Sequence, residues 1–320
     1  MSGYLRQGQW HTGWYDTHAS GGEFVRTEAA FRHHVSADGS SGFRAEPGRY
    51  HLYASLACPW AHRTLIARRL KRLEDVVSLS VVEPVMGDDG WAFGNGPGCI
   101  PDTANGFAFL REVYVAADAH YSGRVTVPVL WDKQRRTIVS NESSEILRMF
   151  DSAFDAFTPV RIGLYPPQLR APIDAVNSLV YGRVNNGVYR CGFAGSQAAY
   201  ERAFDRLFAA LDELEARLAR NRFLVEQRAD APTEADWRLF TTLVRFDAVY
   251  HGHFKCNRQR IADYPALTRL LRELAAVPGV AATVNIDHIK RHYYQSHRHL
   301  NPSGIVPKGP ALDFLPASST

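Results

Sequence analysis

Hydrophobic and polar residues alternate over residues 49–55 (RYHLYAS), whereas apolar residues recur every three to four positions over 60–73 (WAHRTLIARRLKRL). Alternation is typical of a strand, and the longer period is typical of an amphipathic helix. A second β-rich run, VVSLSVVEPV, occupies 76–85, so the three stretches predict a βαβ unit. Two further β-rich runs flank the charged turn of RVTVPVLWDKQRRTIVS (124–140), and the polar start of NESSEILRMFD (141–151) predicts a helix.

After about residue 167 the pattern changes, because almost every stretch has helical periodicity. We therefore predict an α/β domain at 48–157 and an all-helical domain at 168–300, joined by a proline-containing linker. Residues 1–47 have little periodicity and many Gly, Ser and His residues, which indicates an N-terminal extension. Residues 301–320 are rich in Pro, Gly and Ser and are expected to form a C-terminal tail.

The chain has 320 residues, of which 45% are hydrophobic and 22% are charged. This composition is ordinary for a globular enzyme and unlike that of a disordered or fibrous chain. No apolar run reaches the roughly 18 residues that cross a bilayer, and the polar start of the chain does not resemble a signal peptide. We therefore expect a cytoplasmic protein without a membrane partner.

The net charge of +4 is small for this length, and the Lys and Arg residues are dispersed along the chain. The sequence therefore predicts no nucleic-acid surface, while small anionic ligands remain plausible. Four cysteines, Cys58, Cys99, Cys191 and Cys256, have no short paired spacing. We expect neither a disulfide framework nor a zinc site. The histidine-rich stretches near 251–253 and 288–299 lack an accompanying carboxylate cluster, so we expect no metal there either.

Cys58 lies where the predicted strand passes into the predicted helix. The free backbone N–H groups and the positive dipole end of a helix start favour a thiolate over a thiol. Pro59 suits the first helical position because it has no N–H group. A dithiol oxidoreductase would have a cysteine three residues after the nucleophile, where this chain has Ala61, so an external thiol must resolve any disulfide of Cys58. The alternative is that Cys58 is only a small buried residue.

Two further positions belong to the same predicted α/β domain. Pro128 interrupts the strand VTVPVL, which indicates either a cis peptide bond at the end of a strand or an edge strand. Glu142 and Ser143 lie at the start of the helix predicted from 141–151. A helix start can bind an anion, although ordinary capping of the helix explains the same residues.

The Cys-Pro-Trp-Ala sequence at Cys58, the proline after RVTV and the segment SNESSEI together resemble a cysteine-type glutathione transferase. Supporting this, Thr233 and Asp236 in TEADWRLFTTLVRFD have the spacing of a capping box that is buried in that family. More specifically, roughly residues 5–312 resemble the glutathionyl-hydroquinone reductases, the Xi class of glutathione transferases. The motifs that carry this likeness are CPWAHRT (58–64), NNGVYRCGFA (185–194), RFDAVYHGHFKCN (245–257), DHIKRHYYQSH (287–297) and NPSGIVPKGP (301–310).

The resemblance implies an α/β thioredoxin-like N-terminal domain plus an all-α C-terminal domain, the glutathione transferase fold. It also implies glutathione as co-substrate, a homodimer, and reduction of glutathionyl-hydroquinones through a mixed disulfide of Cys58 with glutathione. The matching glutathione-binding positions are Trp91, which would cover glutathione, the strand segment Arg124, Val125, Thr126, Val127 and Pro128, and the γ-glutamyl contacts Glu142 and Ser143.

Three tyrosines match catalytic positions of that family. Tyr189 matches the proton donor to the departing hydroquinone, while Tyr250 and Tyr293 match residues that lower the pKa of the thiol. Tyr294 lies beside Tyr293, and the sequence does not distinguish which of them faces the thiol. Ordinary packing is the alternative for any tyrosine, and it is the interpretation we give to Tyr200.

Other functions remain open at this stage. Cys191 and Cys256 lie inside the matching motifs without a neighbouring base in sequence, so we interpret them as packing residues. An omega-like glutathione thioltransferase or dehydroascorbate reductase would share Cys58 but would not require Tyr189. A noncatalytic glutathione-fold binding protein would keep Glu142 and Ser143 but would not need an activated thiol.

Overall fold

The structure is a computed structural model that describes residues 3–228 and 230–314. The chain divides into two compact units, and each unit collects separate segments of the sequence. The first unit contains the residues up to Trp14, then Thr27–Ile162 and Ala282–Val306. The second unit contains Tyr15–Arg26, Gly163–Ala281 and the residues from Pro307.

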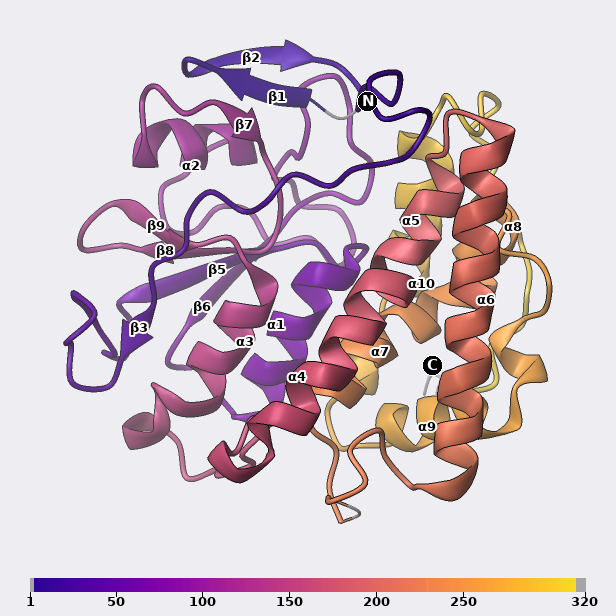
Figure 1. The fold of residues 1–320 in the computed structure, drawn as a ribbon. Coiled ribbons are helices and arrows are strands. Elements are labelled where there is room, and N and C mark those ends of the chain that lie inside the picture. The colour runs from indigo at the N-terminus through magenta and orange to yellow at the C-terminus, as the bar shows by residue number, and fades with distance from the viewer. Residues whose placement is uncertain (1–2, 229, 315–320) are drawn as a thin grey trace. The chain divides into compact units, whose positions relative to one another are not determined.

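The first unit is built on a four-stranded sheet in the order β6-β5-β8-β9 (Figure 1). Strand β5 is parallel to β6 and antiparallel to β8, which is antiparallel to β9. The predicted βαβ unit and the predicted strand pair around the charged turn are therefore confirmed. The strands of this sheet are β5 (Tyr50–Ala54), β6 (Ser78–Val81), β8 (Val129–Asp132) and β9 (Thr137–Ser140).

Helices of the first unit follow these strands along the chain. Helix α1 connects β5 to β6, and it packs against α3, which follows β9. Residues Leu65 and Ile66 of α1 are buried, as the helical period of the sequence predicts. The helices are α1 (Pro59–Leu70), α2 (Leu110–Ala117), α3 (Ser143–Ser152) and α10 (Ile286–Arg291).

The N-terminal extension forms strands that the sequence did not predict. A hairpin of β1 (Gly3–Arg6) and β2 (Gln9–Thr12) pairs through β1 with β7 (Gly123–Arg124), and β3 (Val35–Ser36) lies parallel to β4 (Phe43–Arg44). Gln7 and Gly8, at the hairpin turn, both have positive φ, the backbone conformation of a tight hairpin turn. A Cβ on Gly8 would lie 2.1 Å from the carbonyl oxygen of Ala119, so this turn requires glycine.

The second unit is helical in the part that the structure describes, and this confirms the predicted change of pattern after about 167. Its helices are α4 (Arg170–Leu179), α5 (Asn186–Gly192), α6 (Gln197–Arg220), α7 (Glu234–Arg245), α8 (His251–His253) and α9 (Pro265–Ala275). Helix α6 packs against both α5 and α9. The predicted capping box is present at the start of α7, where the Asp236 carboxylate accepts hydrogen bonds from the backbone and hydroxyl of Thr233 at 2.8 and 3.0 Å.

The units differ from continuous sequence domains in two places. The segment Tyr15–Arg26 of the extension belongs to the second, helical unit. The helix-containing segment Ala282–Val306 belongs to the first unit, although its periodicity resembles that of the helices before it. Over residues 3–228 and 230–314, no helix combines the length and the apolar character that a bilayer crossing requires.

Candidate active site

Cys58 is the N-cap residue of α1, directly after the buried strand β5 and a short turn. Pro59 occupies the first helical position, as predicted, and buried Ala61 stands in the place of a resolving cysteine. The thiol is partly exposed, and its Sγ donates a weak hydrogen bond to the carbonyl oxygen of Val127 at 3.5 Å. The thiol is thus held at the dipole-positive end of a helix, where a negative sulfur is favoured.

Two of the other cysteines, Cys99 and Cys256, have environments that disfavour a thiolate. Burial, followed by a hydrogen bond with Glu83, raises the pKa of Cys99 to about 12. Burial, followed by the neighbouring Cys191 thiol, raises the pKa of Cys256 well above its ordinary value. Both groups are protonated near neutral pH, and Cys191 and Cys256 are buried, which agrees with a packing role. The nucleophile candidate is therefore Cys58.

The segment before Pro128 lies directly beside the thiol. The peptide bond between Val127 and Pro128 is cis, which confirms one of the two conformations predicted for this proline. The Tyr114 hydroxyl donates to the carbonyl oxygen of Thr126 at 2.9 Å and accepts from the Thr126 N–H at 3.2 Å. The same hydroxyl accepts from the amide of Asn141 at 3.1 Å. Tyr114, which the sequence analysis missed, thus ties the strand segment to the residue that precedes Glu142.

Arg124 binds the N-terminal extension through its backbone and its side chain. Its backbone pairs with Tyr4 of β1, and its guanidinium donates to the carbonyl oxygens of Gly13 and Trp14 at 2.7 and 2.8 Å. Val125 is buried, and the backbone polar groups of Thr126 are engaged by Tyr114. Within the predicted strand segment, the carbonyl oxygen of Val127 accepts the hydrogen bond from Cys58.

Glu142 and Ser143 lie at the start of α3, as predicted. The Glu142 carboxylate caps the helix by accepting from the backbone N–H and the hydroxyl of Ser144 at 2.9 and 2.8 Å. A buried guanidinium from α1 reaches this position, because Arg63 donates to the Ser143 hydroxyl at 3.4 Å and lies 4.6 Å from the Trp60 ring centre. Arg63, also missed by the sequence analysis, adds positive charge where α1 and α3 meet.

Trp91 is buried against the C-terminal helical segment of the first unit. Its ring stacks on His292 with centroids 4.8 Å apart, and the His292 Nδ1 lies 2.9 Å from the carbonyl oxygen of Pro84. Tyr293 is fully buried and packs edge-on against His292 and His297, while Tyr294 is slightly more exposed. Tyr293 and Trp91 therefore belong to the same unit as Cys58.

Tyr189 and Tyr250 meet in the second unit, with ring centroids 6.1 Å apart. Tyr189 on α5 also contacts the rings of Phe24, Phe193 and Phe254, and Tyr250 stacks on Phe254 at 5.4 Å. Phe24 comes from the extension, whose lack of periodicity gave no signal for this contact. The two phenols therefore lie in a buried cluster of aromatic rings that pack stacked or edge-on against one another.

Three π-helical turns lie at the predicted tyrosines. Tyr250 ends the turn Phe246–Tyr250, Tyr293 lies inside the turn His292–Ser296, and Tyr189 follows the turn Val180–Asn185 by four residues. Turns of this type inside α-helices occur frequently at functional sites, because the extra residue redirects the side chains that follow. Tyr200, by contrast, lies on the regular helix α6, and its hydroxyl donates to the carbonyl oxygen of Lys255.

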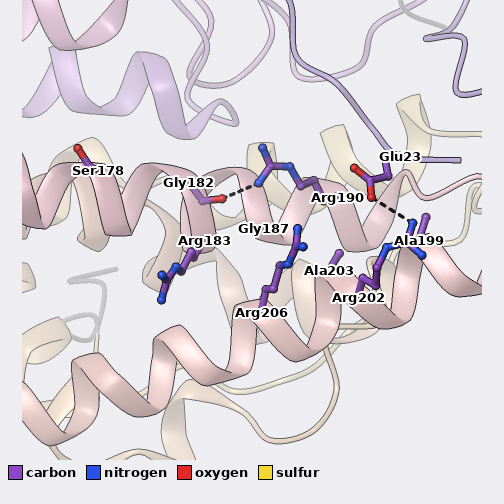
Figure 2. A pocket seen from close by; sticks show the side chains of 10 residues that line it. All are labelled: Glu23, Ser178, Gly182, Arg183, Gly187, Arg190, Ala199, Arg202, Ala203 and Arg206. Carbon is purple, nitrogen blue, oxygen red and sulfur yellow. Dashed lines mark hydrogen bonds and ion pairs between the residues drawn. The ribbon is translucent and has the colours of Figure 1, made fainter. Parts of the chain in front are cut away.

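A cavity of about 350 Å³ also lies in the second unit, along α5 and α6. Figure 2 shows the hydrogen bond that Arg190 donates to the carbonyl oxygen of Gly182 and the ion pair of Arg202 with Glu23. Arg183 and Arg206 also line this cavity, which is therefore rich in basic side chains. The cavity contains none of the predicted site residues. Among the described residues, no three His, Cys, Asp or Glu side chains are grouped so that they could hold a metal ion.

Comparison with known proteins assigns the chain to a family. The family described as "Glutathione S-transferase, N-terminal domain" matches residues 57–153, and "Glutathione S-transferase, C-terminal domain" matches 197–273. Glutathionyl-hydroquinone reductase PcpF of Sphingobium chlorophenolicum is 55% identical over 309 residues, which are 97% of this chain and 96% of that protein. Glutathionyl-hydroquinone reductase YqjG of Escherichia coli (strain K12) is 53% identical, over 98% of this chain and 96% of that protein.

Solved structures agree with these relatives. The Xi class glutathione transferase from Natrialba magadii superposes with a TM-score of 0.92 at 47% identity, covering 98% of this chain and 95% of that one. The glutathione-bound structure of YqjG from Escherichia coli K-12 gives a TM-score of 0.89 at 50% identity, covering 98% and 97% of the two chains. Both halves of the glutathione transferase fold are therefore present, and the chain belongs to the Xi-class glutathione transferases, the family of the glutathionyl-hydroquinone reductases.

Proposed function

We propose that this protein is an enzyme that reduces glutathionyl-hydroquinones to hydroquinones, with glutathione as the reductant. The observation that carries the proposal is a single thiol at the start of α1, beside the Val127 carbonyl and without a resolving cysteine. Relatives that share more than half of the aligned residues carry the name of this activity. A monothiol enzyme of this kind transfers one glutathionyl group to itself and needs a second thiol to release it.

In the first step the Cys58 thiolate attacks the sulfur that joins glutathione to the ring. The ring reacts as its keto tautomer, because a plain aryl thioether is hard to cleave. Tyr189 gives its proton to the ring carbon that bears the sulfur while a ring hydroxyl loses its own proton, and this makes the tautomer. When Cys58 forms its disulfide bond with glutathione, the carbon–sulfur bond breaks, its electron pair passes to the ring carbonyl oxygen, and that oxygen takes a proton to restore the hydroquinone. Tyr250 and Tyr293 favour the thiolate of Cys58 before the attack.

In the second step another glutathione attacks the mixed disulfide as a thiolate. Glutathione disulfide leaves, the Cys58 thiolate is restored, and the proton of the incoming thiol replaces the one that Tyr189 gave away. One glutathione conjugate and one glutathione thus give one hydroquinone and one glutathione disulfide, without a metal in either step. Ping-pong kinetics are the expected signature.

Glutathione is held mainly by residues of the first unit in this proposal. The Val127 backbone pairs with the cysteinyl part like an added strand. The start of α3, with Ser143 and the nearby Arg63, receives the α-carboxylate of the γ-glutamyl group. The Glu142 carboxylate receives its ammonium group, and Trp91 covers the peptide.

A comparison of two substrates tests the function. The enzyme is expected to turn over glutathionyl-menadiol with a kcat/KM at least as high as that for a simple glutathione mixed disulfide. An omega-like thioltransferase would reduce the mixed disulfide and leave the thioether unchanged. A binding protein would turn over neither substrate, and its Cys58 would react with iodoacetamide at the rate of an ordinary thiol.

Replacing Glu142 is expected to weaken glutathione binding. Glu142→Ala should cost about 1.5–3 kcal/mol of binding free energy, the size of a hydrogen bond to a charged group. Because Glu142 also caps α3, the alanine variant should lose stability as well, by about 1 kcal/mol. Glu142→Gln keeps the acceptor for Ser144 but not the charge, so it should weaken binding with little loss of stability. Calorimetry on a Cys58→Ser background measures both, and an unchanged dissociation constant in the two variants would remove Glu142 from the site.

The proposal includes a homodimer in the cytoplasm. The homodimer is inferred from the family resemblance. The cytoplasm is inferred from the composition of the chain. Light scattering of the purified protein measures the first, because a dimer has twice the mass of one chain.

A further inference from the structure

Arg26, from the N-terminal extension, lies over the ring of Tyr189. Its guanidinium carbon is 4.7 Å from the centre of the Tyr189 ring and 5.3 Å from that of Phe24. The guanidinium is fixed in direction, because its Nε donates to the Oδ1 of buried Asn186 at 2.8 Å. Asn186 is the first residue of α5, the helix that carries Tyr189. The cation and the phenol are therefore held by the same helix.

The segment that carries Arg26 is firmly seated on the second unit. The N–H of Gly195 donates to the carbonyl oxygen of Gly22 at 2.8 Å, and Glu23 pairs with Arg202 at 3.1 Å (Figure 2). A Cβ on Gly22, which has a φ of +89°, would lie 2.3 Å from the Ser196 hydroxyl oxygen. A residue placed this closely against α5 and α6 has a defined position, although most of the extension lacks regular structure.

The charge of Arg26 acts on the phenol of Tyr189. A cation over an aromatic face is attracted to the ring, and the attraction grows when the phenol becomes a phenolate. Rings in contact with Tyr189 include Phe24, Phe193, Phe254 and Tyr250, and His253 lies one ring further out, on Phe254. Among these groups Arg26 supplies the permanent positive charge.

We propose that Arg26 is a positioning residue of the reaction, which stabilises the phenolate that Tyr189 becomes when its proton passes to the ring carbon. The inference rests on the proposed role of Tyr189 as proton donor. Arg26 itself exchanges no proton and forms no bond. Its effect is confined to the carbon–sulfur step, since cleavage of a disulfide needs no proton on carbon.

Two variants at this position test the proposal, with Arg202→Gln as the matched control. Arg26→Gln should lower kcat for glutathionyl-menadiol by roughly tenfold near neutral pH and leave reduction of a mixed disulfide unchanged. In a plot of kcat against pH, the alkaline limb at which Tyr189 loses its proton should move upward by roughly one pH unit in this variant. The phenolate is then no longer stabilised by the cation, so the phenol holds its proton to higher pH. Arg26→Lys keeps the charge and should recover part of both effects. Arg202→Gln removes the ion pair with Glu23, whose two side chains are 49% and 45% exposed, and because such an exposed pair contributes little to stability the variant should behave as the unchanged enzyme.

Equal losses on both substrates, or an alkaline limb that stays in place, would reduce Arg26 to a structural residue. Ultraviolet titration of the phenol separates this failure from a failure of the proposed function. The Tyr189 titration is obtained by subtracting spectra of Tyr189→Phe variants, with and without Arg26→Gln, and requires no activity. A Tyr189 phenol that titrates at the same pH with and without Arg26 overturns the inference, whatever the enzyme turns over. If Arg26→Gln does not fold, Arg26→Met, which keeps most of the side-chain length without the charge, gives the same comparison.

Discussion

Cys58→Ala is expected to abolish turnover of glutathionyl-hydroquinones, to below about 10⁻³ of the starting rate, because the glutathionyl group loses its acceptor while Cys191 and Cys256 are buried and Cys99 is held protonated. The unchanged protein, given one equivalent of substrate and no free glutathione, should release hydroquinone once and gain the mass of one glutathione. Peptide mapping by mass spectrometry should place that mass on Cys58. Added glutathione should then remove it as glutathione disulfide.

The remaining thiols provide the control for this experiment. Cys99→Ala should keep full activity, because burial and Glu83 hold that thiol protonated near neutral pH. Because its pKa is raised to about 12, Cys99 loses its proton only far above the pH range of the assay. Glutathione found on Cys191 or Cys256, or turnover that survives Cys58→Ala, would move the nucleophile elsewhere.

Tyr189→Phe is expected to slow glutathionyl-hydroquinone reduction by roughly 10²-fold or more, the usual scale of general acid catalysis, while mixed-disulfide reduction changes little. A phenyl ring keeps the contacts with Phe193 and Phe254, so the loss reports the missing hydroxyl rather than a collapsed cluster. Both substrates would be assayed from pH 5 to 10, since the alkaline limb assigned to Tyr189 should disappear in the variant.

Tyr200→Phe is the matched control for the loss of a phenol. It removes a hydroxyl that donates to the Lys255 carbonyl on a regular helix, and both activities should stay within about twofold. If Tyr189→Phe slows the two substrates by the same factor, Tyr189 is not a specific proton donor. The omega-like thioltransferase would then be the better description.

The sequence predicts the parts of this fold in which local pattern and chemistry coincide. Around Cys58 the strand period, the helix period and Pro59 all point to the same junction, and the structure has it. The capping box of Thr233 and Asp236 is equally local, because its partners are three residues apart. For the same reason the helical character of the chain after about 167 could be predicted from its period.

What the sequence did not predict depends on pairings between distant segments. Strands β1 and β2 are too short for a visible alternation, and they are stabilised by β7, more than a hundred residues away. The period of residues 286–291 predicts a helix but not the unit on which it packs. Arg26 and Phe24 give no signal at all, because they reach Tyr189 from a segment without regular structure.

The discontinuous units also bear on how the protein is made. A ribosome releases the chain from the N-terminus, and domains generally fold as soon as their residues are available. Here the first unit takes in Ala282–Val306, including His292, which stacks on Trp91, so its last elements are synthesised after nearly all of the second unit. During synthesis the surface around Trp91 therefore stays uncovered until Ala282–Val306 has been made. A gene fragment that stops at Ile162 would encode a first unit without Ala282–Val306, and the surface around Trp91 would stay uncovered. A gene must therefore encode the chain beyond the second unit to give a complete first unit.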